Sequence, residues 1–279
     1  MTDPPSTDAA DRPPDALAAA APERRVVETE RRPHDADRAT AANPVHAVGI
    51  GPGSLEYLTP RGERAIREAD AVVGFETVVD YVRDRIDGDV FACGYDDQGE
   101  TLAAFADRVA DGAAGTAVLM GDPNVSGYQF LGRVERAVDD PVEVVPGISA
   151  VQVAASRART PIEDATFVTL HRRGDLTAAR ERLRAAVGDR HLLVLPRPYD
   201  LMPGDVAADL CDAGADPALT ALVCERLTHA DEAVTRATLG ELAAHAGGDG
   251  PDDTPFSDLS VLVVRADDPE PGRTGGRDE

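Results

Sequence analysis

The 279-residue chain contains 51 acidic and 28 basic residues, giving a formal net charge of −23, and every basic residue is Arg. A field of this sign repels nucleic-acid phosphates and anionic lipids, so neither a nucleic acid nor a membrane is an expected partner. Hydrophobic residues make up 42% of the chain, enough for an ordinary globular core, while aromatic residues make up only 4%.

Acidic residues are spread along the whole chain. This pattern is typical of a protein kept soluble in concentrated salt, where screening over a few ångströms mutes self-repulsion. We therefore expect a halophilic protein. An acidic protein from a GC-rich genome is the alternative.

The cysteines and the N-terminus favour a soluble, cytoplasmic protein. Cys93, Cys211 and Cys224 lie far apart and form no C-x-x-C pair, so neither a disulfide framework nor a metal site is expected. No apolar stretch approaches the roughly 20 residues that span a bilayer. The N-terminus also has no basic start and apolar centre of the kind found in secretory signals.

The ends of the chain differ from its middle. Residues 1–43 are rich in Pro, Asp, Ala and Arg without an apolar period, and 267–279 are similar, so both are expected to be disordered. Between them we expect an N-terminal α/β domain at 44–162 and a C-terminal α/β domain at 163–266.

The first domain is expected to alternate strands and helices. The expected elements are strand 45–50, helix 59–69, strand 71–75, helix 76–85, helix 101–111, strand 116–120, helix 127–137, strand 142–145 and a helix from 149. This alternation predicts a mainly parallel sheet covered on both faces.

The second domain is expected to be a smaller, mixed α/β domain. Its expected elements are strand 166–170, helix 176–187, strand 191–195, helix 206–213, strand 219–227, helix 238–246 and strand 259–265. The fold class is therefore two-domain α/β, with a ligand cleft expected between the domains.

Three Gly/Pro loops follow expected strands of the first domain. They are GIGPG at 49–53, GDP at 121–123 and PGISA at 146–150. Ligands of open α/β sheets bind at the carboxyl ends of the strands, so three such loops predict a binding site. A phosphate-binding Walker loop is excluded because the chain has no Lys. A nicotinamide site is disfavoured because Asp70 precedes its strand instead of following it.

In order, GIGPGSLEYLT at 49–59, GDP at 121–123 and VPGISA at 145–150 resemble the signatures of the tetrapyrrole methylases. CERLTHADEAVTRATLGEL at 224–242 is similar to the family's C-terminal segment. The segment 142–174 is similar to the branch that methylates cobalt-precorrin-7 at C5 in cobalamin synthesis. GDPNVSG departs from the form common in that branch, and the N-terminal extension has no counterpart in the family core.

The resemblance implies S-adenosylmethionine as the methyl donor and a tetrapyrrole as the substrate. The residues that it places at the donor are Pro52, Gly121, Asp122, Val125, Ser149, Ala150, Leu195 and Cys224. Asp122 can instead act as a capping residue. No catalytic acid or base is assigned, because transfer of an activated methyl group depends on alignment and exclusion of water more than on a strong base.

His171, Arg172 and Arg173 leave an expected strand together, and Arg pairs well with carboxylates. They are candidates for binding the carboxylates of the substrate, with a solvated basic loop as the alternative. The resemblance also implies a homodimer, and any partner enzyme for methylation at C15 would be a separate chain. The functional alternatives are methylation of another precorrin carbon or of uroporphyrinogen, diphthine synthesis, and a catalytically silent ligand-binding module.

Overall fold

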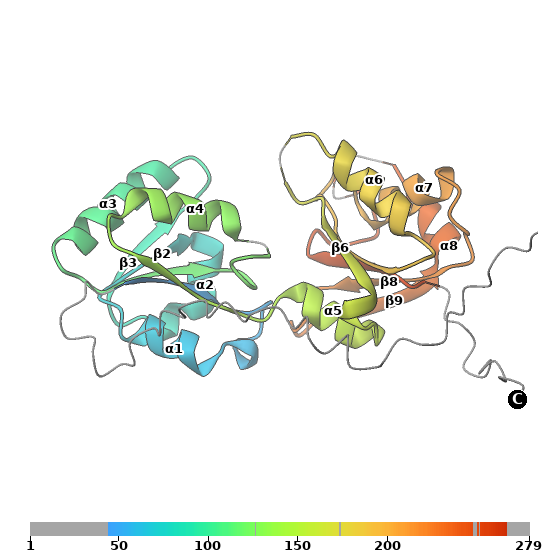
Figure 1. The fold of residues 1–279 in the computed structure, drawn as a ribbon. Helices are drawn as coiled ribbons and strands as arrows, with labels where there is room; N and C mark the ends of the chain where they lie inside the picture. Colours follow the sequence, from blue (N-terminus) through green and yellow to red (C-terminus); the bar gives the residue numbers. More distant parts are fainter. Residues whose placement is uncertain (1–43, 126, 173, 248–249, 251, 267–279) are drawn as a thin grey trace, which may run out of the picture. The chain divides into compact units, whose positions relative to one another are not determined.

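The computed structural model describes residues 44–125, 127–172, 174–247, 250 and 252–266. These residues form two five-stranded sheets with helices packed on them (Figure 1). The segments 1–43 and 267–279, expected to be disordered, lie outside the described residues. Among the described helices, none is long and apolar enough to cross a membrane.

The first sheet is entirely parallel, as the alternation of elements predicts. Its order is β3-β2-β4-β1-β5. The strands are β1 (Val45–Gly49), β2 (Ala71–Phe75), β3 (Asp89–Cys93), β4 (Gly115–Leu119) and β5 (Val142–Val145).

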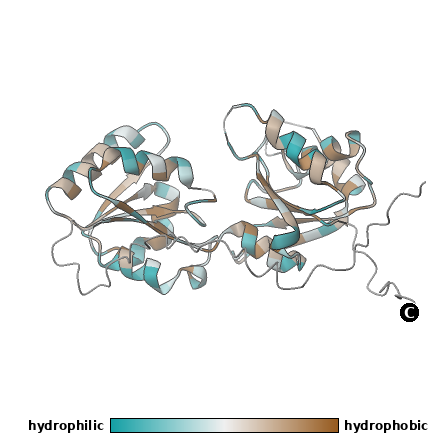
Figure 2. Ribbon diagram, viewed as in Figure 1, coloured by the Kyte–Doolittle hydropathy of each residue, from teal (hydrophilic) through white to brown (hydrophobic). Residues whose placement is uncertain are grey.

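Helices cover both faces of this sheet. They are α1 (Pro60–Arg67), α2 (Glu76–Val82), α3 (Gln98–Ala110) and α4 (Tyr128–Ala137). Successive strand residues point to opposite faces, so Ala47 joins the core under α3 and α4, while Val48 joins the core under α1 and α2. Burial on both faces explains why the central strands are continuous apolar runs, drawn mostly brown in Figure 2.

The expected start of α1 is confirmed. Thr59 Oγ1 accepts a hydrogen bond from the Gly62 N–H at 3.1 Å, and Pro60 occupies the first helical position. The hydroxyl satisfies one of the amides left free at the helix start, and proline loses nothing there because its missing N–H would have no partner.

The second sheet is mixed, as expected. Its order is β6-β7-β10-β8-β9, in which β6 and β7 are parallel and the remaining neighbours are antiparallel. The strands are β6 (Ala165–Thr169), β7 (His191–Leu195), β8 (Thr220–Glu225), β9 (Ala233–Thr238) and β10 (Ser260–Val264).

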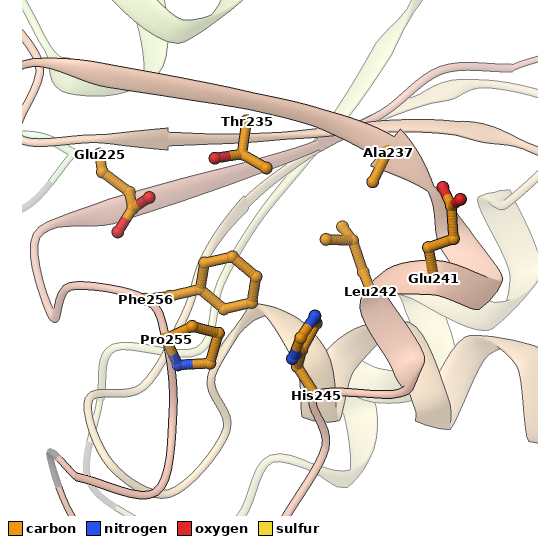
Figure 3. A pocket seen from close by; sticks show the side chains of 8 residues that line it. All are labelled: Glu225, Thr235, Ala237, Glu241, Leu242, His245, Pro255 and Phe256. Carbon is orange, nitrogen blue, oxygen red and sulfur yellow. The ribbon is translucent and has the colours of Figure 1, made fainter.

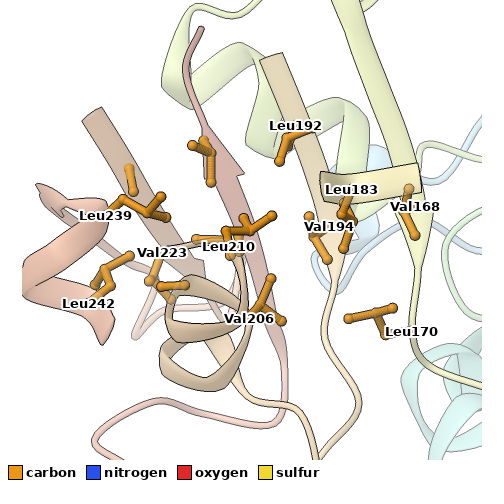
Figure 4. Packing of buried hydrophobic residues seen from close by; sticks show 14 of the residues in the cluster. Val168, Leu170, Leu183, Leu192, Val194, Val206, Leu210, Val223, Leu239 and Leu242 are labelled. Carbon is orange, nitrogen blue, oxygen red and sulfur yellow. The ribbon is translucent and has the colours of Figure 1, made fainter. Parts of the chain in front are cut away.

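Four helices pack on the second sheet. On one face, α6 (Thr177–Ala186), α7 (Pro203–Asp212) and α8 (Leu239–Ala243) enclose a core of Leu and Val side chains (Figure 4). On the other face, α5 (Ala150–Ala158) packs through Val151 and Ala154 against Leu193 and Val263. The boundary between 44–162 and 163–266 stays a prediction, and by its contacts α5 lies on the second sheet.

Two edge strands, β3 and β9, are absent from the expected elements. β3 begins with an exposed Asp and is only partly buried, while β9 is exposed along most of its length. An edge strand covered poorly on its faces needs no long apolar run, so the pattern used to find strands is missing.

Candidate active site

Three loops follow β1, β4 and β5 at the carboxyl edge of the first sheet, and their backbones contact one another. The Gly121 N–H donates to the Gly51 carbonyl at 2.8 Å, and the Gly51 N–H donates back to the Gly121 carbonyl at 3.3 Å. Both glycines have positive φ, +92° for Gly51 and +66° for Gly121, a conformation that other residues rarely adopt. The glycines therefore let the loops meet at a distance that side chains would prevent.

Gly147 completes this contact. A Cβ on Gly147 would lie 2.2 Å from the Gly121 carbonyl oxygen and 2.6 Å from that of Gly49. Both neighbours are backbone atoms of other loops, which cannot rotate away as a side chain can. The structure thus brings together the three loops that the sequence singles out, and it shows why each carries glycine.

Asp122 ties two of the loops together. One carboxylate oxygen accepts from the Asn124 N–H at 2.8 Å and the other accepts from the Gly147 N–H at 3.1 Å. Asp122 does not cap α4, whose N-cap is Gly127 without a side-chain bond; it closes a turn within its own loop and binds the loop after β5. Because an ionised carboxylate offers about four acceptor sites, Asp122 keeps capacity for a further hydrogen bond. Its contact with a methyl donor stays a prediction.

Ser149 is also engaged by its own helix. It is 2% exposed, its Oγ accepts from the Val151 N–H at 3.2 Å, and its N–H donates to Gln152 Oε1 at 2.8 Å. This reciprocal capping box fixes the loop that leads into α5. Pro52 is buried in the loop after β1, beside the paired backbones of Gly51 and Gly121.

Four of the predicted donor residues share one apolar cluster. Cys224 is fully buried in it on β8, and Val125, Ala150 and Leu195 pack against it half-buried. Val125 comes from the loop after β4, Ala150 begins α5, and Leu195 ends β7. The structure brings together residues separated by about a hundred positions, although their contact with a donor stays a prediction.

The cysteines should be poor nucleophiles. Burial, the main cause, raises the pKa of Cys93 and Cys224 to about 11, with the charges of Asp97 and Glu232 adding to the respective effects. The pKa of Cys211 is also raised, but Cys211 is only partly buried. Since the thiolate is the reactive form, these thiols do not act as catalytic nucleophiles at neutral pH.

We expect iodoacetamide at pH 8 to alkylate Cys211 first in the native protein and to leave Cys93 and Cys224 unmodified. Alkylation of all three should follow unfolding in urea. Peptide mass spectrometry over time measures both, and native alkylation of Cys224 as fast as Cys211 would show that its site is open to solvent.

His171 and Arg172 follow the carboxyl end of β6, which lies beside the carboxyl end of the parallel strand β7 because Thr169 pairs with Leu195. The His171 side chain is exposed. Partial loss of its hydration lowers the pKa of His171, and the charge of Asp258 acts to raise it. The Arg172 side chain donates to the Asp175 carbonyl at 3.4 Å, and Arg173 lies outside the described residues. Binding of substrate carboxylates by this segment stays a prediction.

A network that sequence reasoning missed connects the loop after β1 to the turn after β8. The Ser54 N–H donates to Thr228 Oγ1 at 2.9 Å, and Glu232 accepts from the Thr228 N–H at 2.7 Å. Arg157 on α5 holds the same carboxylate through two nitrogens at 2.5 and 3.2 Å. The sequence feature that could have pointed to this network is the segment 224–242, which resembles the family's C-terminal segment and contains Thr228 and Glu232.

This turn has an unusual backbone. Arg226 and Thr228 have positive φ, +47° and +70°, a region in which non-glycine residues cost of the order of 1–3 kcal/mol when strained. Ion pairing of Arg226 with Asp231 at 2.5 Å and the hydrogen bond from Thr228 to Glu232 hold the turn in place. The surroundings therefore impose the conformation that presents Thr228 to Ser54.

We expect Glu232→Gln to lower the free energy of unfolding by about 1–2 kcal/mol at pH 7, since it removes the charge from a hydrogen-bonded pair. Arg157 holds the pKa of Glu232 below its ordinary value of 4.5. The stabilisation that ionised Glu232 contributes is therefore complete above the pKa of Glu232 in the unfolded chain. It is lost as the pH falls through the lower pKa of Glu232 in the folded protein. Urea unfolding at pH 7 and at pH 3 should show a smaller difference between variant and wild type at pH 3.

A pocket on the second sheet does not coincide with the predicted donor or substrate residues. It has a volume of about 240 Å³ and lies between β8, β9, α8 and the segment at 255–256 (Figure 3). Its carboxylates already accept hydrogen bonds, Glu225 from the Ser257 N–H and Glu241 from the Thr238 N–H. None of its lining residues is among those predicted for the donor or the substrate.

Among the described residues, no group of three or more His, Cys, Asp or Glu side chains is placed to hold a metal ion. Where the loops of Gly51, Gly121 and Gly147 meet, the polar groups are backbone N–H and carbonyl groups and the Asp122 carboxylate. Such a site positions a ligand closely against the backbone and carries out little acid–base chemistry of its own.

Comparison with known structures supports the same fold. The methyltransferase CobJ matches with a TM-score of 0.66 at 22% identity, covering 81% of this chain and 95% of that one. A precorrin-6Y methylase from Archaeoglobus fulgidus matches with a TM-score of 0.56 at 21% identity, covering 81% and 100%. A uroporphyrin-III C-methyltransferase from Thermus thermophilus, crystallised with S-adenosylhomocysteine, matches at 0.61 and 22%, covering 80% and 92%.

Among curated proteins, a probable cobalt-precorrin-7 C(5)-methyltransferase from Methanocaldococcus jannaschii is 29% identical over 226 residues, covering 80% of this chain and 99% of that protein. Siroheme synthase 1 from Serratia proteamaculans is 28% identical over 219 residues, covering 70% of this chain and 44% of that protein. The family model of the tetrapyrrole (corrin/porphyrin) methylases matches residues 44–243. The chain belongs to this family and is an S-adenosylmethionine-dependent methyltransferase.

Proposed function

We propose that the chain methylates a corrin precursor of cobalamin biosynthesis, and specifically cobalt-precorrin-7 at C5. The observation that carries the proposal is the match to the Methanocaldococcus jannaschii protein, which covers nearly all of that protein and most of this chain. A probable cobalt-factor III C(17)-methyltransferase is also 29% identical, over 160 residues, so the ring carbon that is methylated needs the sharpest test.

The loops at the carboxyl edge of the first sheet suit the methyl donor. Gly49, Gly121 and Gly147 leave no side chain between the three loop backbones, and Asp122 has acceptor capacity to spare. The donor supplies a methyl group that is already activated as a sulfonium. The chain then contributes alignment and exclusion of water, for which backbone groups and small apolar side chains such as Val125 and Ala150 suffice.

The reaction balances without a metal or a redox partner. The ring carbon forms a bond to the methyl carbon, the bond from that carbon to sulfur breaks, and S-adenosylhomocysteine leaves. A proton lost from the ring passes to water. We assign His171 and Arg172, with Arg173, to binding substrate carboxylates, because they follow β6 where it ends beside Leu195. We also propose that the protein acts as a homodimer, which light scattering after gel filtration tests.

The decisive experiment incubates the protein with methyl-labelled S-adenosylmethionine and, separately, cobalt-precorrin-7, earlier cobalt-precorrins, uroporphyrinogen III and elongation factor 2. We expect label in cobalt-precorrin-7 alone, and NMR of the product to place it at C5. Turnover of uroporphyrinogen or elongation factor 2 would overturn the corrin proposal. Donor binding in calorimetry with no turnover of any substrate would instead identify a silent binding module.

A further inference from the structure

Aromatic side chains are scarce in this protein, yet three of them contact one another in a row of tilted rings at the carboxyl edge of the first sheet. The chain has six Phe, five Tyr and no Trp. The ring of Phe75 lies 5.1 Å from that of Phe130 on one side and 5.1 Å from that of Tyr95 on the other. These separations are typical of favourable aromatic pairs.

The three residues come from elements beside the glycine loops. Phe75 ends β2, and β2 pairs with β4, the strand that leads into the loop of Gly121 and Asp122. Tyr95 follows the end of β3, and Phe130 lies in the first turn of α4, just after that same loop. The row therefore adjoins the part of the edge that we assign to the methyl donor.

Exposure increases along the row. Phe130 is 6% exposed, Phe75 is half-buried, and Tyr95 is 76% exposed. Tyr128, also in the first turn of α4, is 48% exposed. Tyr95 thus contacts the half-buried Phe75, which is itself backed by the buried Phe130, and its other side is open to solvent. Packing does not require such a ring, since a polar side chain would be better solvated there.

The charges around Tyr95 decide what it can bind. Asp96 and Asp97 follow it directly, and one oxygen of Asp97 accepts from the Gly94 N–H at 2.7 Å. Arg133, whose positive charge acts on Cys93, donates a hydrogen bond to Gln98 Oε1 on α3. Carboxylates of a polyanionic ligand would be repelled by the two Asp side chains, so the favourable contact available to Tyr95 is with an uncharged, flat surface.

We propose that Tyr95, supported by Phe75 and Phe130, is a substrate-positioning residue that stacks on the face of the tetrapyrrole macrocycle. Carboxylates at the rim of the macrocycle would then point away from Asp96 and Asp97, toward other parts of the protein. The inference rests on the proposed function, because it takes the substrate to be a tetrapyrrole.

The test compares Tyr95→Ala and Tyr95→Phe with Ile162→Ala, a matched control that removes an apolar side chain 54% exposed just before β6. The probe is cobyrinic acid, a polycarboxylated cobalt corrin, titrated by its visible absorption. Calorimetry with S-adenosylhomocysteine is the second readout. We expect Tyr95→Ala to weaken corrin binding about tenfold, as loss of one stacked ring does for flat ligands. Tyr95→Phe and Ile162→Ala should bind the corrin like wild type, and donor affinity should stay unchanged in all three.

The outcomes separate the two proposals. If wild type binds the corrin and Tyr95→Ala binds it equally well, the stacking role is wrong and the proposed function stands. If Tyr95→Ala lowers the affinity for S-adenosylhomocysteine as much as the affinity for the corrin, the effect is structural and the positioning role is also wrong. If wild type binds no corrin and methylates no cobalt-precorrin, the proposed function fails and this inference fails with it.

Discussion

Replacing Gly147 with Ala is expected to lower methyltransferase activity about 100-fold, the cost of displacing reacting groups by about an ångström. The new methyl carbon would stand 2.2 Å from one backbone oxygen and 2.6 Å from another, where about 3.4 Å is comfortable. The loops after β1, β4 and β5 must therefore move apart. Overpacking of this kind also lowers the free energy of unfolding by about 1–3 kcal/mol.

The matched control is Gly132→Ala. Gly132 lies inside α4, where an added Cβ would meet only the end of the Arg136 side chain at 3.5 Å. Alanine there should raise stability by roughly 0.5–1 kcal/mol and leave activity unchanged. Thermal melts with and without S-adenosylhomocysteine give a readout that does not depend on turnover. If Gly147→Ala keeps the ligand-induced rise in melting temperature seen in wild type, the loop contact is not needed for donor binding.

The architecture could be predicted from the sequence because the buried elements have strong local signals. The central strands are apolar runs that end in glycine or proline loops, and Thr59-Pro60 marks the start of α1 with a cap and a first-turn proline. The edge strands β3 and β9 could not be found in this way. Their exposed faces carry Asp, Thr and Arg, so they resemble loops until a neighbouring strand is known.

The site could be predicted only in part. Order along the chain places the loops of Gly51, Gly121 and Gly147 at one sheet edge, because carboxyl ends of parallel strands share an edge. Contacts between distant side chains have no such signal. Ser54 and Thr228 are 174 positions apart, and nothing in either segment alone indicates their hydrogen bond. The contact of Tyr95 with Phe75 likewise depends on the pairing of β2 with β3, a strand that the sequence does not reveal.

The second large effect is expected from Asp122→Ala, which removes the acceptor that joins the loop after β4 to the loop after β5 and a second acceptor within the loop after β4. Losing the bonds from the Asn124 and Gly147 amides should cost about 1–3 kcal/mol of unfolding free energy. If Asp122 also accepts a hydrogen bond from the donor, affinity for S-adenosylhomocysteine should fall at least tenfold in calorimetry at a temperature where the variant is folded. Asp122→Asn should lower the affinity less than Asp122→Ala, because its carbonyl oxygen can still accept one of the two N–H bonds while its amide nitrogen cannot accept the other.

A matched control separates donor binding from loss of a turn. Asp216 accepts from the Ala218 N–H at 2.8 Å, the same two-residue span and distance as the bond from the Asn124 N–H to Asp122, but it lies before β8 and carries no bond to a second loop. Asp216→Ala should therefore lower stability slightly and leave donor affinity unchanged. If Asp122→Ala also leaves donor affinity unchanged, its carboxylate serves only to hold the loops. The polar groups of the methyl donor would then be bound by backbone groups at the glycine contact centred on Gly147, beside apolar side chains such as Val125 and Ala150.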